Sequence, residues 1–306
     1  MFQKVNPIIL REMRGRMRGW RAFVVLTIFL MLLSCLAGSV YAVVYSESVS
    51  YNPYGLTAPS VQYGPVIGKS IFSGVVLLLL MITSFIAPAF TAGAITGERE
   101  QKTYEVLLIT PMQARQIVSG KLGAVFLFLL LLILAALPIQ SLAFLFGGVA
   151  LGEVLIAAVG LLVTVFAFGA LGLYVSTLAR TTMVAIIITY SFVIFTYALP
   201  LMLFYFGVTL LSPVIGYSDP NLLLQVIAVA LVYVIGFALS INPLSSALLT
   251  AVIAADGQGY FFFKENFGQI TFWFISPWLI YVTFYTLLAL LLLFLTIRRV
   301  AKISDK

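Results

Sequence analysis

The side chains that could support catalysis are few in this chain. It has no histidine and one cysteine, Cys35, among 306 residues. A zinc site built on His or Cys therefore lacks its ligands, and Ser–His and Cys–His nucleophile pairs lack their imidazole base. Three acidic residues, Asp219, Asp256 and Glu265, could in principle meet, but loops separate them and no motif supports a catalytic pair. We expect no enzymatic activity in this chain by itself.

One short segment is similar to a nucleotide-binding loop. Residues 64–70, GPVIGKS, are one residue short of the GxxxxGK[ST] pattern whose backbone cradles phosphates. No predicted strand precedes the segment, and the charge distribution described below places it on the outer side of a membrane, away from cytosolic ATP. We interpret the similarity as chance, so a process driven by ATP would need a separate chain to hydrolyse it.

The one long charged stretch inside the chain is residues 97–121, GEREQKTYEVLLITPMQARQIVSGK, which we call the coupling segment. It lies between two apolar runs of about 25 residues, each long enough to cross a bilayer. Glu98 and Lys102 are four residues apart with the acid first, the order that favours an ion pair on a helix. The next apolar residues share one side of that helix: Tyr104, Leu107 and Leu108. The pattern predicts a short amphipathic helix that could transmit force to both runs.

A second helix is predicted to follow after a sharp bend at Thr110. Thr110, Pro111 and Gln113 have the spacing of a capping box with proline at the first helical position. The helix then carries Arg115 and continues through Lys121 into the next apolar run. The competing interpretation is a solvated loop that only connects two spans. The caps and the apolar side favour the ordered interpretation.

The composition places the chain in a membrane. Hydrophobic residues make up 62% of the sequence, charged residues 9%, and the mean hydropathy is +1.15, whereas a soluble domain carries about 25% charged residues. Long uncharged windows are typical of helical spans, because a barrel would show short alternating strands. The sequence predicts a single all-α polytopic domain over residues 1–306, with six spans near residues 22–46, 70–95, 122–147, 154–179, 182–208 and 277–297.

The distribution of basic residues indicates the topology. If both termini are cytoplasmic, six crossings keep 15 of the 17 lysines and arginines inside, and only Lys69 and Lys264 lie outside. A seventh apolar stretch, 222–240, must then belong to an outer re-entrant or interfacial region, 222–276. Asn242 and Pro243 have the types expected of a helix cap and a first helical residue. They predict a short fresh helix over residues 243–255, stopped at Asp256.

The N-terminal residues 1–21 have the pattern of an amphipathic helix lying on the inner leaflet. On a helix one arc is apolar, with Ile9, Met13, Met17 and Trp20, and the facing arc is cationic, with Arg11, Arg14, Arg18 and Arg21. Cationic side chains there would meet anionic lipid headgroups. The alternative is a topology signal with no helix of its own. Both interpretations keep the N-terminus inside.

Aromatic residues crowd the approach to the last span, between residues 260 and 278. An aromatic belt at the level of the lipid headgroups is the favoured interpretation. A ligand-stacking box is the alternative, and we predict no site there.

A secondary carrier is the main alternative class of protein. Such a carrier normally places an ionisable side chain near the middle of the membrane to bind its coupling ion. Glu153 lies at the outer end of a predicted span, and Gln140, Thr164 and Thr189 within the spans are neutral. Neutral hydroxyl groups in spans are more often packing contacts than substrate ligands. The carrier interpretation is therefore disfavoured.

Several segments together resemble the membrane subunits of ATP-binding cassette transporters of the type-2 exporter class. Residues 6–12, NPIILRE, are similar to the opening elbow helix of that family. Residues 97–100, GERE, with Thr103 resemble its coupling segment, and residues 111–121 resemble the return to its third span. Residues 242–244, NPL, are similar to an outer motif before the last span. Residues 212–240 are longer than the simplest pattern of the family, and no large outer domain suggests a substrate.

The resemblance implies a complex in which one kind of subunit hydrolyses ATP and another crosses the membrane. A cytoplasmic ATPase subunit would hold ATP and magnesium and grip the chain near Glu98, while this chain would hold no cofactor. A second membrane subunit, identical or different, and the lipid of a plasma membrane, the inner one in bacteria, would be the other partners, with no nucleic acid. The residues expected to carry coupling are Gly97, Glu98, Arg99, Glu100, Thr103, Pro111 and Lys121, and those of the elbow are Arg11, Arg14, Arg18, Trp20 and Arg21. The substrate and the direction of transport stay open.

Overall fold

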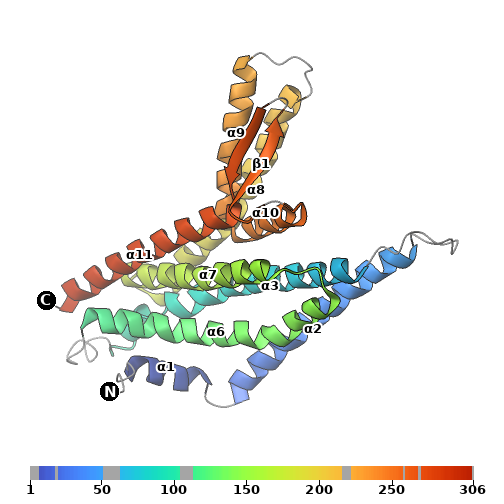
Figure 1. Ribbon diagram of the computed structural model, residues 1–306. Helices are drawn as coiled ribbons and strands as arrows, with labels where there is room; N and C mark the ends of the chain where they lie inside the picture. Colours follow the sequence, from blue (N-terminus) through green and yellow to red (C-terminus); the bar gives the residue numbers. More distant parts are fainter. Residues whose placement is uncertain are drawn as a thin grey trace, which may run out of the picture.

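The structure is a computed structural model that describes residues 7–17, 20–50, 63–103, 113–215, 222–257, 259–267 and 270–304. Its elements in chain order are α1 (Pro7–Met17), α2 (Trp20–Ser50), α3 (Tyr63–Ala92), α4 (Thr96–Glu100), α6 (Ala114–Phe146), α7 (Leu151–Leu178), α8 (Thr182–Ile215), α9 (Leu222–Ile241), α10 (Pro243–Ala255), β1 (Phe262–Phe267), β2 (Ile270–Ile275) and α11 (Pro277–Ser304). Most of these elements are long helices, which form the bundle in Figure 1.

Six of the helical segments in the described ranges are long and apolar enough to cross a membrane. They are Phe23–Ser46, Gly64–Glu100, Ala114–Phe146, Leu151–Leu178, Thr182–Gly207 and Pro277–Lys302. Each contains or overlaps one of the six windows predicted from hydropathy. The predicted all-α polytopic bundle with six spans is therefore confirmed.

The core of the bundle lies between α3 and the helices around it. α3 packs against α2, α6, α7 and α8, and the side chains of Leu79, Leu129 and Phe168 are buried at these contacts. α3 and α7 lie close together at Gly172, where a Cβ atom would lie 3.1 Å from the Cα of Pro88. Small residues at helix contacts allow the close packing that holds helices together in lipid. α3 and α7 thus form a tightly packed pair.

The two ends of the bundle differ in their charged groups. At one end the last turns of α7 and α11 meet the start of α6, and a cluster of Ile95, Val118, Leu173 and Val300 is buried there. α1 lies at the same end as the C-terminal turns of α11 in Figure 1. Nearly all the described basic side chains belong to elements at this end, which we call the basic end. At the opposite end Lys69 of α3 forms an ion pair with Glu153 of α7.

The chain bends by 114° between α9 and α10. Asn242 is the N-cap of α10, and its side chain accepts hydrogen bonds from the N–H groups of Leu244 and Ser245, with Pro243 at the start of the helix. α10 ends at Ala255, with Asp256 as its C-cap and Gly257 at a φ of 69°. This break and this fresh short helix are confirmed as the sequence predicts them.

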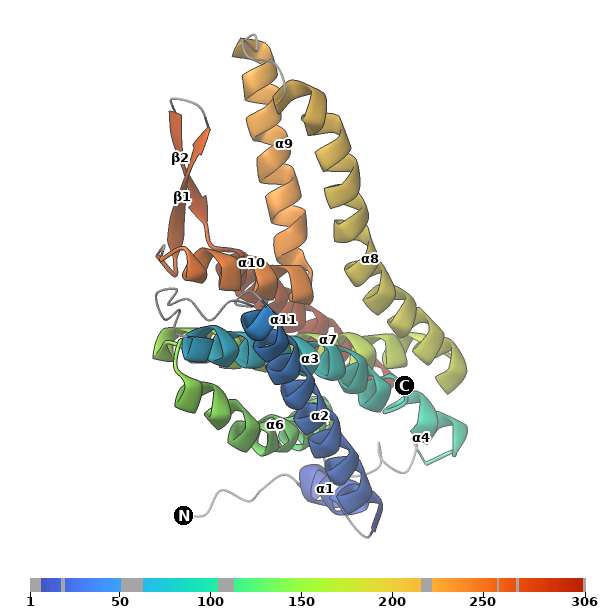
Figure 2. The same cartoon turned by 90° about the vertical axis from the view of Figure 1, so that its right-hand side faces the viewer.

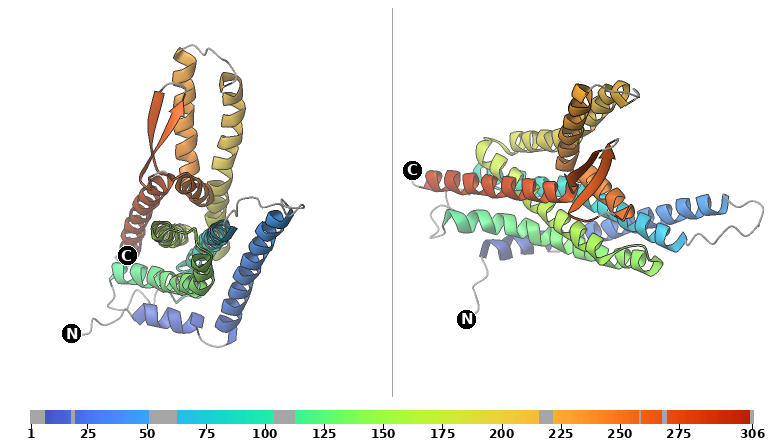
Figure 3. Two further views of the ribbon diagram at one scale, coloured as in Figure 1. Left: turned by 45° about the vertical axis from the view of Figure 1, so that its right-hand side comes forward. Right: turned by 45° about the horizontal axis from the view of Figure 1, so that its top comes forward.

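An arm formed by α8, α9 and a β-hairpin extends away from the bundle (Figures 1, 2 and 3). The hairpin pairs β1 and β2 antiparallel, with Phe263 opposite Phe274. It packs on α9, where the ring of Tyr233 stacks on that of Phe274 at 4.6 Å. The hairpin is the one element of the described chain that the sequence analysis did not predict.

Candidate functional site

α4 is a five-residue helix that follows α3 after a turn at residues 93–95. It ends at Glu100, and Lys102 has a φ of 57°, which lies in the left-handed region. A right-handed helix cannot continue through such a residue. The predicted ion pair between Glu98 and Lys102 is therefore wrong, because the helix ends before Lys102 can lie above Glu98. Residues 104–112, with Pro111 among them, lie outside the described residues.

The partner of Glu98 is Lys121, in the second turn of α6. The ammonium group of Lys121 donates hydrogen bonds to Glu98 Oε1 and to the carbonyl oxygen of Ala94, both at 2.8 Å. It also lies 3.8 Å from a carboxylate oxygen of Glu12 on α1. The Lys121 side chain is 4% exposed. One buried cation thus joins α1, the α3–α4 turn, α4 and α6.

Glu98 is turned towards the bundle more than towards solvent. Its side chain is 21% exposed, and among the described residues its second oxygen, Oε2, is buried without a hydrogen-bond partner. Removing one member of a buried ion pair costs more than the pair contributes, because the remaining charge stays desolvated. The ion pair between Glu98 and Lys121 therefore stabilises both side chains and fixes the position of α4.

α4 is also fastened to the turn between α7 and α8. The guanidinium group of Arg99 donates a hydrogen bond to the carbonyl oxygen of Ala179 at 3.2 Å. The hydroxyl of Ser176, near the end of α7, accepts hydrogen bonds from the backbone N–H groups of Ile95 and Thr96. These contacts connect residues about 80 positions apart in the sequence. They fix the start of α4 against the end of α7.

Glu100 caps the first turn of α8. Its carboxylate accepts hydrogen bonds from the N–H of Thr182 at 2.7 Å and from the Thr182 hydroxyl at 2.8 Å. These two hydrogen bonds lower the pKa of the Glu100 carboxyl, and the bond from the N–H has the larger effect. A negative charge at a helix N-terminus is also favoured by the helix dipole. Thr182, the first residue of α8, the long helix of the arm, is therefore bound by a side chain of α4.

The remaining residues of the coupling segment have simpler positions. Thr103 is exposed, and its hydroxyl donates a hydrogen bond to the carbonyl oxygen of Glu98. A Cβ atom at Gly97 would meet nothing within 4 Å. The helix α6 begins at Ala114, with Gln113 as N-cap and Gln116 completing the capping box. Thr110 and Pro111, where a capping box was predicted, lie outside the described residues, and Gln113, which that prediction placed inside the helix, is the extended N-cap of α6.

The elbow residues divide between two helices. In α1, Arg11 and Arg14 are exposed, and Ile9 lies against α6, 3.2 Å from where a Cβ of Gly123 would be. α1 ends at Met17, whereas Trp20, 81% exposed, begins α2 together with Arg21. α1 is therefore shorter than the single amphipathic helix predicted through residue 21. Arg18 and the side chain of Arg21 lie outside the described residues.

Three residues that the sequence analysis missed complete the site: Glu12, Ser176 and Thr182. Their partners lie about 80 or more positions away in the chain, so no local spacing pointed to the contacts. Thr182 did carry one signal, since a small hydroxyl residue after Arg180 marks a helix start. No group of His, Cys, Asp or Glu side chains in the described chain is placed to hold a metal ion. The side-chain contacts described above join α4 to α1, α6, α7 and α8.

The comparisons with known proteins bear on the whole chain. The model of the family described as "ABC-2 family transporter protein" matches residues 7–298. The matched range includes the coupling segment, the first five spans, most of the sixth and the bend at Asn242. No curated protein gave a match to the chain.

Proposed function

Because this chain belongs to the ABC-2 family of transporter proteins, we propose that it couples ATP hydrolysis in a separate cytoplasmic ATPase subunit to the export of a substrate. The ATPase would hold ATP and magnesium, and a second membrane subunit would complete the pathway across the membrane. The chain itself is an integral multi-pass membrane protein, and a bacterial inner membrane is its expected location.

The observation that carries this proposal is the fastening of α4 to its neighbours. Side chains of α4 contact α6 through Lys121, the α7–α8 turn through Arg99, and the start of α8 through Glu100. A helix of five residues has too few internal hydrogen bonds to be stable alone, so these contacts keep it in place. A push on α4 would therefore move the starts of α6 and α8 together.

The charge distribution supports a cytoplasmic position for α4. Arg99, Arg115, Lys121 and Arg180 all belong to the basic end of the bundle, and the positive-inside rule places such residues in the cytoplasm. The exposed side chains next to α4, on residues 101–103, offer contacts to the ATPase. In the proposed coupling set, Glu98 acts with them by setting the orientation of α4.

Co-purification tests the class of protein. We expect a tag on this chain to recover a cytosolic ATPase from the native membrane, whereas a secondary carrier would be recovered without one. The buried side chains of the described spans support the first outcome, since Lys121, at the basic end, is the one Asp, Glu, Lys or Arg among them. Recovery of the intact chain without any ATPase would overturn the proposal.

A substitution then tests the coupling site within the purified complex. Glu98→Ala should leave membrane insertion intact and lower transport-linked ATP hydrolysis, because α4 loses its link to Lys121. Asp256→Ala is the matched control, since it removes an exposed acid beyond the end of α10. Equal ATP turnover in the two variants would remove Glu98 from the mechanism.

A further inference from the structure

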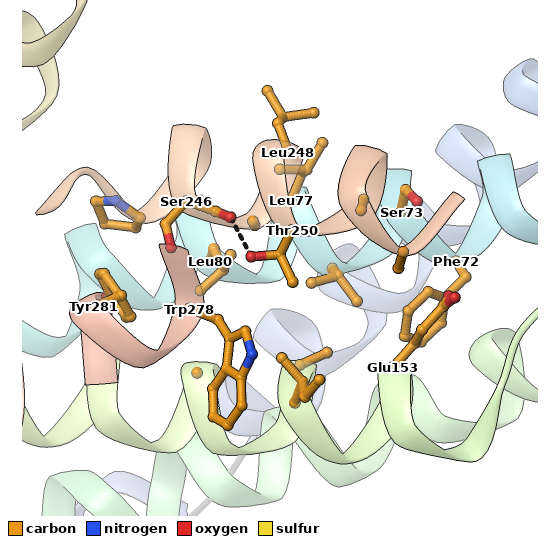
Figure 4. Close-up of a pocket in the computed structure, with 18 of the residues that line it drawn as sticks. Phe72, Ser73, Leu77, Leu80, Glu153, Ser246, Leu248, Thr250, Trp278 and Tyr281 are labelled. Atoms are coloured by element: carbon orange, nitrogen blue, oxygen red, sulfur yellow. Dashed lines mark hydrogen bonds between the residues drawn. The ribbon is translucent and has the colours of Figure 1, made fainter. Parts of the chain in front are cut away.

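A cavity of about 90 Å³ lies between α3, α7, α10 and α11, near the end of the bundle that carries Lys69 and Glu153. This volume is several times the roughly 10–15 Å³ that one water molecule needs. Figure 4 shows that α3 and α7 line its long walls and α10 covers it. The cavity therefore has the outline of a slot between helices.

The lining residues give the slot its length. On α3 they run from Phe72 to Leu80, and on α7 from Glu153 to Gly160. At about 1.5 Å per residue, each of these stretches is about 10–12 Å long. The α10 side is lined mainly by small residues, such as Ala247 and Ala251, so the space is left open where larger side chains would fill it.

The two ends of the slot differ in polarity. At one end Glu153 pairs with Lys69 at 3.4 Å, and Tyr260 lies nearby in the lining. At the other end lie Leu80 and Tyr281. The Tyr281 hydroxyl is already hydrogen-bonded to Thr164 at 2.8 Å, and the charged side chain of the lining, Glu153, lies at the opposite end. A ligand would place its polar part at the ion pair and an apolar part along the slot.

This polarity matches a lipid in its own leaflet. The ion pair lies at the bundle end opposite the basic end, where lipid headgroups of the outer leaflet would be, and the apolar end points towards the middle of the membrane. Trp278 lines the slot and donates its ring N–H to the carbonyl oxygen of Tyr260, in the manner of aromatic residues at a membrane interface. A narrow slot about 10–12 Å long suits a hydrocarbon chain better than a compact solute.

We propose that the slot binds one acyl chain of an outer-leaflet phospholipid, with the zwitterionic headgroup beside Lys69 and Glu153. The binding needs no ATPase partner, so it can be measured on the purified chain and can fail independently of the proposed transport function. α10 covers the slot, so an occupied slot would hold the bend at Asn242 against α3 and α7.

Trp278 supplies the measurement. In the full chain with Trp20→Phe and Trp273→Phe, Trp278 is the one tryptophan left, and bromine atoms on a lipid chain quench its fluorescence on contact. The detergent-solubilised protein is titrated with phosphatidylcholine brominated on its acyl chains. We expect quenching that saturates at one lipid per chain.

Two alanines of α10 give the matched variants. Ala251→Phe fills the slot and should weaken the saturable quenching at least tenfold, whereas Ala255→Phe adds the same ring at an exposed position outside the lining and should leave it unchanged. Mass spectrometry of the protein without the tryptophan changes should find one retained phospholipid, lost in Ala251→Phe alone. Quenching that never saturates, or that is equal in both variants, or a protein that retains no lipid, overturns the proposal.

Discussion

Replacing Lys121 with methionine leaves an unbranched side chain one atom shorter and removes the charge that joins α1, α4 and α6. In the native protein the ammonium group lies 2.8 Å from both Glu98 Oε1 and the carbonyl oxygen of Ala94. In Lys121→Met the Glu98 carboxylate keeps its charge in a site built around a cation. We expect the variant to be destabilised by this uncompensated charge.

The magnitude follows from burial. Removing one partner of a fully buried ion pair costs about 3–5 kcal/mol. The Lys121 side chain is 4% exposed, but those of Glu98 and Glu12 are 21% and 30% exposed, so water reaches the remaining acids and reduces the penalty. We expect a loss of about 2–3 kcal/mol in the free energy of unfolding. The double variant Lys121→Met with Glu98→Gln removes both charges, and should recover to within about 1 kcal/mol of the native protein.

Thermal unfolding of the purified protein in detergent measures these differences. About 2–4 °C per kcal/mol is usual for domains somewhat smaller than this one, so Lys121→Met should lower Tm by roughly 4–12 °C. Lys102→Met is the matched control, because Lys102 is exposed and makes no ion pair with Glu98, and its Tm should stay within about 1 °C. The reasoning is refuted if both methionine variants have the same Tm, or if adding Glu98→Gln fails to raise the Tm of Lys121→Met.

Three further outcomes are expected. Glu100→Gln should lower the Tm near pH 7. The difference from the native protein should shrink as the pH falls below about 4.5, because a carboxyl group with a lowered pKa stabilises the fold only while it is charged. A difference in Tm that does not change with pH would contradict this. Tyr281→Phe should cost about 1 kcal/mol in thermal unfolding, since it removes one buried hydrogen bond to α7. In a Cys35→Ser background, cysteines placed at Asp256 and Ala301 should react with membrane-impermeant reagents from opposite sides; reaction from the same side would overturn the six-span count.

The spans could be predicted from the sequence because their signal is local. A window of uncharged residues long enough to cross a bilayer needs no knowledge of its neighbours, and all six windows correspond to helices. The bend at Asn242 is local in the same way, since a cap and a following proline act within one helical turn. The sequence is sufficient to predict an element when its side chains interact with the backbone of the same helical turn.

The hairpin carried a local signal that the aromatic content obscured. Its two strands are rich in aromatic residues and are joined by Gly268 and Gln269, and a two-residue connection with glycine first is typical of a hairpin. Aromatic residues next to a predicted span also suit a belt at the headgroups. Composition alone could not separate these two structures.

The contacts of α4 could not be predicted by local reasoning. The spacing of Glu98 and Lys102 satisfies the rule for a helical ion pair, but Glu98 pairs with Lys121, which lies on another helix. Lys121 is the preferred partner because it is buried against the bundle, where an ion pair is screened less than on an exposed helix of five residues. Long-range partners such as Thr182 for Glu100 become visible only when α4 and α8 are placed together.

The attachment of α8 indicates how a small movement of α4 would reach the end of the bundle opposite the basic end. α8 is about 50 Å long by its 34 residues, and along its first half a narrow stripe faces the bundle, with Ala185, Thr189, Val193 and Thr196 buried. Most of the remaining surface is exposed, apart from half-buried residues beside the stripe such as Tyr190 and Tyr197, which stack on Phe85. The later part of the helix leaves the bundle as the arm (Figure 2). A helix held at its first turn by Glu100 and packed along one stripe can tilt about that stripe with little repacking. Displacement of α4 would then appear as a larger displacement of α9 and the hairpin. Under the proposed function, the distance between this arm and α2 is therefore the coordinate to follow while the partner subunit hydrolyses ATP.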